Sequence, residues 1–283
     1  MNRNDVYKIE AAFPSLSEQK RIVAILDGAF EGISTAVANA EKNLANAREL
    51  FESYLNSVFT GNGEGWVRKK LGDLMDIAHG YAFEGRDFGT SENTDKPIVL
   101  TPGNYTENGE LIFTPKNTKR FAGNPPVAFL FNPGDLTVVM TDLSSKMKIL
   151  GKPAFVEQSN VLHNQRIGRI LIKDASISPR YVFYFLRTRQ SSENIKETAT
   201  GTMVRHTAPK RILSIVMPFT RDLLDQQKIV SRLDALSQET KCLEAIYQQK
   251  LASLAELKQS ILQKAFTGEL TAQPNKVLQE AVA

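Results

Sequence analysis

The chain contains the same long segment twice. Glu18–Gly61 and Asp225–Gly268 align without a gap at an offset of 207 residues, and 15 of the 44 aligned positions are identical. Most of the other apolar positions match in kind, whereas the stretch between the copies shares no such pattern with them. This arrangement predicts a repeated scaffold that carries a different domain between its two copies.

Each copy shows the pattern of a long helix that packs on another helix. Apolar or small residues recur every three or four positions, which is a heptad-like stripe. Each copy ends in Thr-Gly, and a glycine there supplies the left-handed conformation that closes a helix. A helix of this length would measure roughly 65 Å, and its stripe needs a partner. We therefore predict an antiparallel coiled coil of two helices, within 15–61 and 219–268, although one helix packed on an ordinary globular body would also fit. The predicted coiled-coil or subunit-interface residues are Ile22, Leu26, Ile33, Leu50, Tyr54, Ile229, Leu233, Leu236, Leu243, Leu254, Leu257 and Ile261.

The basic charge of the chain is concentrated between the helices. Residues 66–217 hold 21 Lys and Arg against 14 Asp and Glu, whereas the net charge of the whole chain is only +4. A local basic excess is typical of a domain that faces a polyanion. The single cysteine, Cys242, excludes an internal disulfide framework. No uninterrupted apolar run approaches the roughly 18 residues that span a bilayer, and no secretory signal is recognisable, so we expect a soluble, cytoplasmic protein.

The middle segment reads as a mixed, strand-rich domain over 66–218. Gly, Pro and Asn separate short β-like runs, and Pro179 opens a predicted helix over 179–197. The fold class is therefore α+β, with one globular domain flanked by two long helices. Residues 1–14 resemble a last strand of an absent upstream domain, and residues 269–283 look like a flexible tail. The β-like runs lie at 97–102, 110–115, 127–131, 135–141, 152–156 and 166–172.

Catalytic signatures are weak. The tetrapeptide NPPV (124–127) resembles the N-P-P-aromatic motif of amino-group DNA methyltransferases, but Val127 replaces the aromatic residue that would stack on a flipped base. The pattern of a phosphate-binding P-loop is absent, and the three histidines do not have the spacing of metal ligands. We therefore predict no catalytic residues, no metal and no cofactor.

Four loops of the middle domain carry the side chains that read nucleic acids. They lie in GYAFEGRDF (80–88), MTDLSSKMKILGK (140–152), LHNQR (162–166) and TGTMVRHTAPKR (200–211). Asn, Gln, Arg and Lys recognise base edges, and Ser, Thr and Lys commonly hold phosphates. The predicted DNA-binding residues are Tyr81, Phe83, Arg86, Thr141, Ser144, Ser145, Lys146, Lys148, Lys152, Asn164, Gln165, Arg166, Thr202, Arg205, His206 and Lys210.

Several motifs occur in the order found in one protein family. The helix entry FPSLSEQKRIVAILD (13–27), the domain opening with Trp66 and LGDL (71–74), and then GYAFEGRDF, NPGDLTVVMTDLS, HNQRIGRI and GTMVRHTAPKRIL follow one another. This set resembles the specificity subunit of type I restriction–modification systems over nearly the whole chain. The second helix entry, MPFTRDLLDQQKIV (217–230), departs from the usual form of the motif.

The resemblance implies a non-catalytic DNA reader. Such a subunit would bind double-stranded DNA, hold DNA-methyltransferase (modification) subunits that carry the S-adenosylmethionine chemistry, and join restriction/motor subunits. Full-length members carry two recognition domains, whereas this chain has one, so we expect it to read one half-site. A head-to-tail homodimer could then read a two-part site.

Two other functions remain open at this point. The chain could be an interaction-only protein that occupies modification subunits through its helices without reading DNA. It could also be an enzyme, a fused methyltransferase or nuclease, although the sequence lacks a cofactor loop and a carboxylate cluster.

Overall fold

The computed structural model describes residues 13–60, 65–85, 88–89, 95–124 and 126–272. The chain divides into two compact units, a helical unit of Met1–Phe51 with Ser237–Ala283 and a mixed unit of Glu52–Leu236. Most of the predicted strand at 1–14 and the end of the predicted tail, from residue 273, lie outside the described residues.

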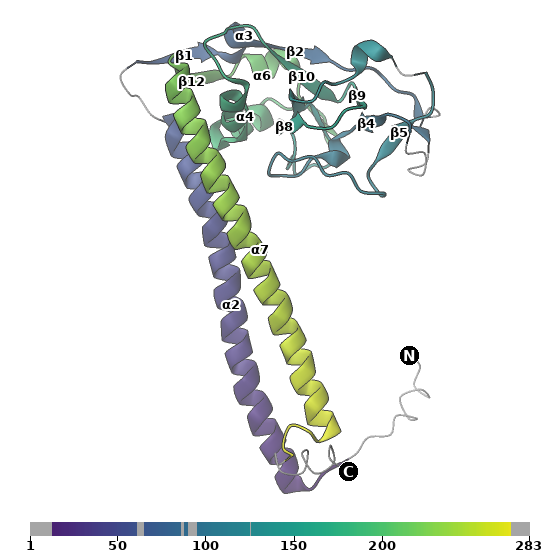
Figure 1. The fold of residues 1–283 in the computed structure, drawn as a ribbon, viewed down its shortest axis with the longest axis vertical. Helices are drawn as coiled ribbons and strands as arrows, with labels where there is room; N and C mark the ends of the chain where they lie inside the picture. Colours follow the sequence, from purple (N-terminus) through teal and green to yellow (C-terminus); the bar gives the residue numbers. More distant parts are fainter. Residues whose placement is uncertain (1–12, 61–64, 86–87, 90–94, 125, 273–283) are drawn as a thin grey trace. The chain divides into compact units, whose positions relative to one another are not determined.

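Two helices of 45 residues each form the scaffold, α2 (Leu16–Thr60) and α7 (Leu223–Thr267). Ser15 accepts a hydrogen bond from the Glu18 N–H at 3.4 Å and caps the start of α2, and Gly268, with φ of +81°, follows the end of α7. Within the helical unit the two helices run antiparallel (Figure 1), because Arg48 pairs with Glu244 at 2.8 Å and the Lys258 ammonium lies 5.2 Å from the ring centroid of Phe30. The predicted α+β fold with an antiparallel pair of flanking helices is confirmed.

The predicted stripe is only partly covered. Small side chains, Ala40 and Ala47, are buried, which indicates close approach of the backbones, and Phe51 is buried at the position next to the exposed Leu50. Of the predicted interface residues, Ile33 and Leu233 are buried, and Leu50, Leu243 and Leu257 are exposed. The half-buried members are Ile22, Leu26, Tyr54, Ile229, Leu236, Leu254 and Ile261.

By length and composition alone, α2 is apolar enough to cross a membrane. It contains an 18-residue window with a mean hydropathy of 1.3, and 6% of that window is buried in the structure. The sequence expectation concerned an uninterrupted apolar run, which this measure does not test. The average tolerates up to two charged residues, whereas the sequence criterion required an uninterrupted run. A long helix whose apolar stripe packs on another helix has the same length and the same average hydropathy.

The described residues of the mixed unit form two four-stranded sheets and two short strand pairs. One sheet has the order β2 (Met75–His79), β10 (Ile167–Ile172), β6 (Asp135–Val139) and β8 (Pro153–Val156), all antiparallel. The other has the order β3 (Phe88–Gly89), β5 (Lys119–Phe121), β4 (Ile98–Leu100) and β9 (Val161–His163), with β4 and β9 parallel. The strand pairs are β1 (Trp66–Lys70) with β12 (Val216–Thr220), and β7 (Thr141–Asp142) with β11 (Arg205–His206). The short helices are α3 (Leu71–Leu74), η2 (Pro102–Asn104), η3 (Val127–Phe129), α4 (Pro179–Arg187), α5 (Arg189–Glu197) and α6 (Pro209–Leu213).

The two larger sheets share one hydrophobic core. Leu100 and Val161 from one sheet are packed with Val139, Val156 and Ile167 from the other. These side chains are 0–1% exposed, and burying one such side chain contributes about 1.5–3 kcal/mol. Because β1 and β12 are paired, the domain begins and ends at the same place, which lets both long helices leave it together.

Three local predictions fail. Residues 127–131 contain the 3₁₀ turn η3 rather than a strand, since Pro126 (φ of −71°) precedes it and supplies no N–H for a ladder. Residues 110–115 form only an isolated bridge, between Leu111 and Tyr105. The helix predicted over 179–197 is split into α4 and α5 at Thr188, which is extended (ψ of 155°) and caps α5 by accepting the Ser191 N–H.

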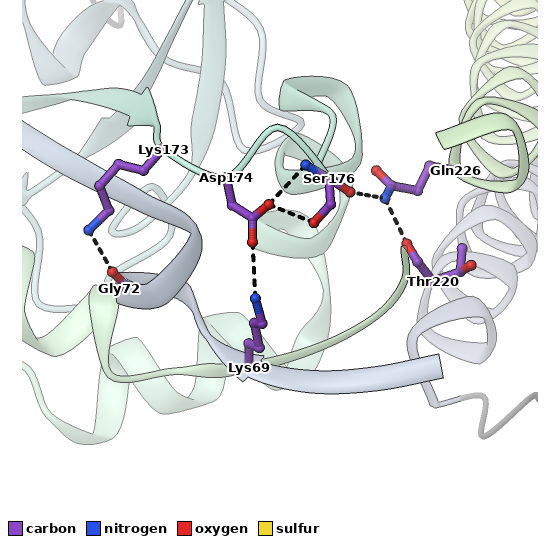
Figure 2. A network of polar contacts seen from close by, with 7 residues as sticks. All are labelled: Lys69, Gly72, Lys173, Asp174, Ser176, Thr220 and Gln226. Atoms are coloured by element: carbon purple, nitrogen blue, oxygen red, sulfur yellow. Dashed lines mark hydrogen bonds and ion pairs between the residues drawn. The ribbon is translucent and has the colours of Figure 1, made fainter. Parts of the chain in front are cut away.

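A buried glutamine connects the strand-rich domain with the start of α7 (Figure 2). Gln226 is 0% exposed; its amide donates to the carbonyls of Ser176 and Thr220, each at 2.7 Å, and its oxygen accepts the Ser178 N–H at 2.9 Å. The loop that it holds is itself ordered by Asp174, which accepts from the Ser176 N–H and hydroxyl and pairs with Lys69 at 3.0 Å. These hydrogen bonds, and then the lysine, lower the pKa of Asp174.

Two further residues hold α4 against the long helices. Asp234 of α7 pairs with Arg180 at 2.8 Å and accepts the hydroxyl of Tyr184. Phe59 of α2 is 2% exposed, and its ring lies edge-on to Tyr181 and Phe185, with centroids 5.0 and 5.5 Å away. We refer to Gln226, Asp234 and Phe59 as the docking triad, because each of them contacts α4 or the loop before it.

Candidate nucleic-acid interface

Two of the four predicted loops are joined by the main chain. The Tyr81 N–H donates to the His163 carbonyl at 2.8 Å, and the Gln165 N–H donates to the Tyr81 carbonyl at 3.0 Å. The approach is so close that a Cβ on Gly80 would lie 2.4 Å from the Asn164 carbonyl. A glycine is therefore required at position 80 for these loops to meet.

His163 supports the loop of residues 162–166 from within the core. It is 2% exposed, lies 4.7 Å from the ring of Phe131, and shares a 2.8 Å hydrogen bond with the Ile167 carbonyl. A carbonyl only accepts, so Nε2 carries the proton. Burial lowers the pKa of His163 to about 4, which leaves the ring neutral near pH 7. Asn164 is buried and accepts the Arg166 N–H at 2.9 Å, and the turn leaves Gln165 and Arg166 exposed.

A buried carboxylate shapes the loop of residues 140–152. Asp142 is 3% exposed and accepts two backbone N–H groups, from Ser144 at 2.8 Å and from Ile149 at 3.0 Å. Met147 within this loop has a φ of +49°, an uncommon value for a residue other than glycine. The loop therefore has a defined shape, and it presents the predicted contact residues Ser144, Ser145, Lys146 and Lys148 as exposed side chains.

The loop of residues 200–211 pairs with the loop of residues 140–152. β11 and β7 place Arg205 opposite Asp142 and His206 opposite Thr141, and the Thr141 hydroxyl lies 3.1 Å from Nδ1 of His206. Thr200 and His206 exchange two backbone hydrogen bonds of 2.9 Å, which close a tip at Gly201. Gly201 has a φ of +92°, and a Cβ there would lie 2.0 Å from the Val204 carbonyl oxygen.

The main chain also connects the two pairs of loops with each other. The Met140 N–H donates to the Arg166 carbonyl, and the Thr207 N–H donates to the Met140 carbonyl, both at 2.9 Å. The structure thus joins segments that lie far apart in the sequence, and we call them the loop cluster. Its predicted contact residues are Tyr81, Phe83, Thr141, Ser144, Ser145, Lys146, Asn164, Gln165, Arg166, Thr202, Arg205 and His206.

Four predicted contact residues differ from these in burial, in ion pairing or in position. Lys152 is half-buried, and its pKa is lowered by burial and then by the charges of Arg187 and Lys196. It therefore lies near α4 and α5, which carry these two residues. Lys148 pairs with Glu107 at 2.6 Å. Lys210 is exposed on α6, after the fourth loop, and Arg86 lies outside the described residues.

Aromatic side chains pack around Tyr81 and Phe83 of the loop cluster. Phe83 is half-buried and lies 5.0 Å, centroid to centroid, from both Tyr81 and Phe121. Tyr81 also contacts Phe129 at 5.5 Å and remains 43% exposed. Tyr81 therefore combines a fixed ring position with an accessible face, which suits contact with a base or sugar.

The predicted residues do not include two residues of this surface, Asp142 and Met203, or the buried Gln226 at the start of α7. Asp142 shapes the loop of residues 140–152 but is absent from the predicted contact residues. Met203 is 80% exposed at the tip of the fourth loop, where its apolar character drew no attention. Gln226 lies in the repeated helix and is identical with Gln19, but the sequence pattern does not predict its buried contacts. Among the described residues, no three His, Cys, Asp or Glu side chains are grouped so that they could hold a metal ion.

Comparison with known proteins gives one consistent result. The family described as the type I restriction modification DNA specificity domain matches residues 63–251. The specificity subunit of the type I restriction enzyme EcoBI from Escherichia coli is 21% identical over 227 residues, which are 80% of this chain and 44% of that protein. The StySPI specificity subunit from Salmonella potsdam is 22% identical over 213 residues, 74% of this chain and 44% of that protein. The chain thus spans less than half the length of these curated relatives.

Solved structures share the fold. A chain from a study of complex assembly and conformational transition in a type I R-M system superposes with a TM-score of 0.76 at 20% identity, covering 95% of this chain and 64% of that one. The HsdS subunit from Thermoanaerobacter tengcongensis gives a TM-score of 0.55 at 22% identity, covering 94% of this chain and 62% of that one. These similarities extend over the domain and both long helices.

Proposed function

Since the chain belongs to the type I restriction modification DNA specificity family, we propose that it is a non-catalytic subunit that reads duplex DNA through the loop cluster. The recognition domain within residues 66–218 would read one half of a two-part target. The relatives' names, specificity subunits of type I restriction enzymes, support this proposal at the level of the family.

The observation that carries the proposal is the convergence of the four loops. Segments near residues 81, 142, 165 and 206 are linked by main-chain hydrogen bonds, and they expose Lys146, Gln165, Arg166 and His206. Fixed backbones let side chains meet base edges without a large ordering cost on binding. The excess of seven positive charges in residues 66–217 (21 against 14) supplies the attraction to phosphates.

We also propose the partners and the location of the subunit. The long helices would hold modification subunits, restriction/motor subunits would join that complex, and the assembly would act in the cytoplasm without a cofactor bound to this chain. Exposed apolar side chains along the helices, Val23, Leu50, Ile246 and Leu257, support further packing by partner helices.

A binding measurement on the assembled complex tests this function. The complex with modification subunits should bind a labelled duplex that contains the target, and Lys146→Ala and Arg205→Ala should each weaken it. Unchanged binding by variants in all four loops would refute the assignment of the surface.

The interaction-only alternative makes the opposite prediction. A complex that assembles with modification subunits but binds no duplex at low salt would favour it. The proposed head-to-tail homodimer is tested separately, by the mass of the free chain in solution across a range of concentrations.

A further inference from the structure

Three exposed apolar residues lie at one end of the β7–β11 strand pair. Leu143 directly follows β7, and Met203 and Val204 directly precede β11, so the antiparallel pairing brings them to the same end. Leu143 is 58% exposed, Met203 80% and Val204 38%. A single exposed apolar side chain is ordinary, whereas several together on a surface indicate contact with another molecule. We call these three residues the apolar tip.

The loops that carry the apolar tip are held by hydrogen bonds at its base. Thr200 and His206 exchange two hydrogen bonds of 2.9 Å across the segment 201–205. The buried Asp142, next to Leu143, accepts two N–H groups of its own loop. Little backbone ordering is therefore needed when the tip enters a ligand, which lowers the conformational cost of binding.

The surroundings of the apolar tip suit a polyanion. Neither the segment 143–152 nor the segment 200–211 contains an aspartate or a glutamate. Exposed hydroxyl and basic side chains flank the tip on both loops, and they include Ser144, Ser145, Lys146, Thr202 and His206. An apolar centre within a rim that suits phosphates matches duplex DNA, in which stacked bases lie between two phosphate backbones.

We propose that the apolar tip is a wedge that enters one base-pair step of the bound duplex, with Met203 as the leading side chain. Leucine and methionine are among the apolar residues that proteins insert between base pairs to unstack and kink DNA. Met203 is the most exposed residue of the tip, and its unbranched side chain adapts to a narrow gap. The inference rests on the proposed reading of DNA and adds one specific step to it.

A wedge selects sequence without a hydrogen bond to a base. Pyrimidine–purine steps such as TA and CA unstack and kink more easily than other steps, so a wedge favours them. The role of Met203 is therefore to select a deformable step at a fixed distance from the bases that Gln165 and Arg166 contact.

The end-to-end distance of a bound duplex tests the wedge. The complex with modification subunits is saturated with a duplex that it enriches from a random pool, which carries a donor and an acceptor dye at its two ends. Met203→Ala should reduce the bend at saturation, whereas Met203→Leu, which keeps an apolar wedge, should retain it. Val127→Ala removes an apolar side chain that is 75% exposed outside the tip, and it should leave the bend unchanged.

A mismatched base pair provides a second measurement. Because a mismatch already weakens stacking, a mismatch at the wedged step should tighten binding about tenfold. A series of duplexes in which the mismatch moves one position at a time locates this step. The gain in affinity should be absent in Met203→Ala.

The outcomes separate this inference from the proposed function. A complex that binds no duplex refutes both. Duplex binding with the same end-to-end distance for the original chain and for Met203→Ala combined with Leu143→Ala refutes the wedge alone, as does a mismatch series without a preferred position. Failure of Met203→Ala to assemble with modification subunits, seen as a lower mass in solution, would identify a protein as the occupant of the tip and would also overturn the proposal.

Discussion

The repeat offers an internal control for one quantitative prediction, the replacement of Gln226 by alanine. This side chain is fully buried and satisfies two carbonyls and one N–H. Each neutral hydrogen bond contributes about 1 kcal/mol net, and buried groups left unpaired cost at least as much, so Gln226→Ala should lower the free energy of unfolding by about 3 kcal/mol. The same change at Gln19 removes one bond on the surface and should cost less than about 1 kcal/mol.

Urea unfolding followed by fluorescence measures the difference. The only tryptophan, Trp66, is paired with Thr220 next to Gln226, so it reports on the domain concerned. The midpoint should fall clearly for Gln226→Ala and hardly for Gln19→Ala, with an unchanged slope for both. Equal, small losses would refute the view that Gln226 holds the domain to α7.

Three further predictions concern the loop cluster. Gly80→Ala should separate two loops and lower the free energy of unfolding by about 2–4 kcal/mol, as chemical denaturation would show, whereas Gly85→Ala has no atom within 4 Å of its new Cβ and should be nearly neutral. In filter-binding titrations of the complex, Arg166→Ala should weaken DNA binding about tenfold and reduce the salt slope by about one, while Lys152→Ala, at a half-buried position beside other helices, should change neither. His163 resists protonation in the folded state down to a pKa of about 4, whereas the unfolded chain takes up this proton near pH 6.5. The free energy of unfolding should therefore be highest above pH 6.5 and fall by up to about 3 kcal/mol as the pH drops from 6.5 to 4; urea titrations should show this slope vanish in His163→Gln.

The long helices were predictable because their signal is local and repeated. An apolar stripe of period 3.6 and a terminal glycine predict a helix from a single segment. Both copies of the repeat contain this pattern. The register of the stripe was less accessible. Phe51 is buried while its neighbour Leu50 is exposed, and a shift of one position along a helix turns a side chain by about 100°.

The loops were predictable one by one but not as a cluster. Their residue types marked each of them in the sequence, whereas their meeting depends on pairing between positions such as Met140 and Arg166, or Thr141 and His206, which no local pattern encodes. The same limit explains Lys152. Its side chain is of a type that suits DNA contact, but in the fold it lies near Arg187 and Lys196. Thr188 splits a predicted helix because its hydroxyl caps the second half, a choice that the surrounding packing decides.

Selection from a pool of random duplexes measures whether the loop cluster selects DNA sequence. The complex of this chain with modification subunits should enrich a defined short sequence, and Gln165→Ala or Arg166→Ala should relax the preference at particular base positions. Enrichment of no sequence, or of the same sequence with the same strength by variants in all four loops, would contradict the account.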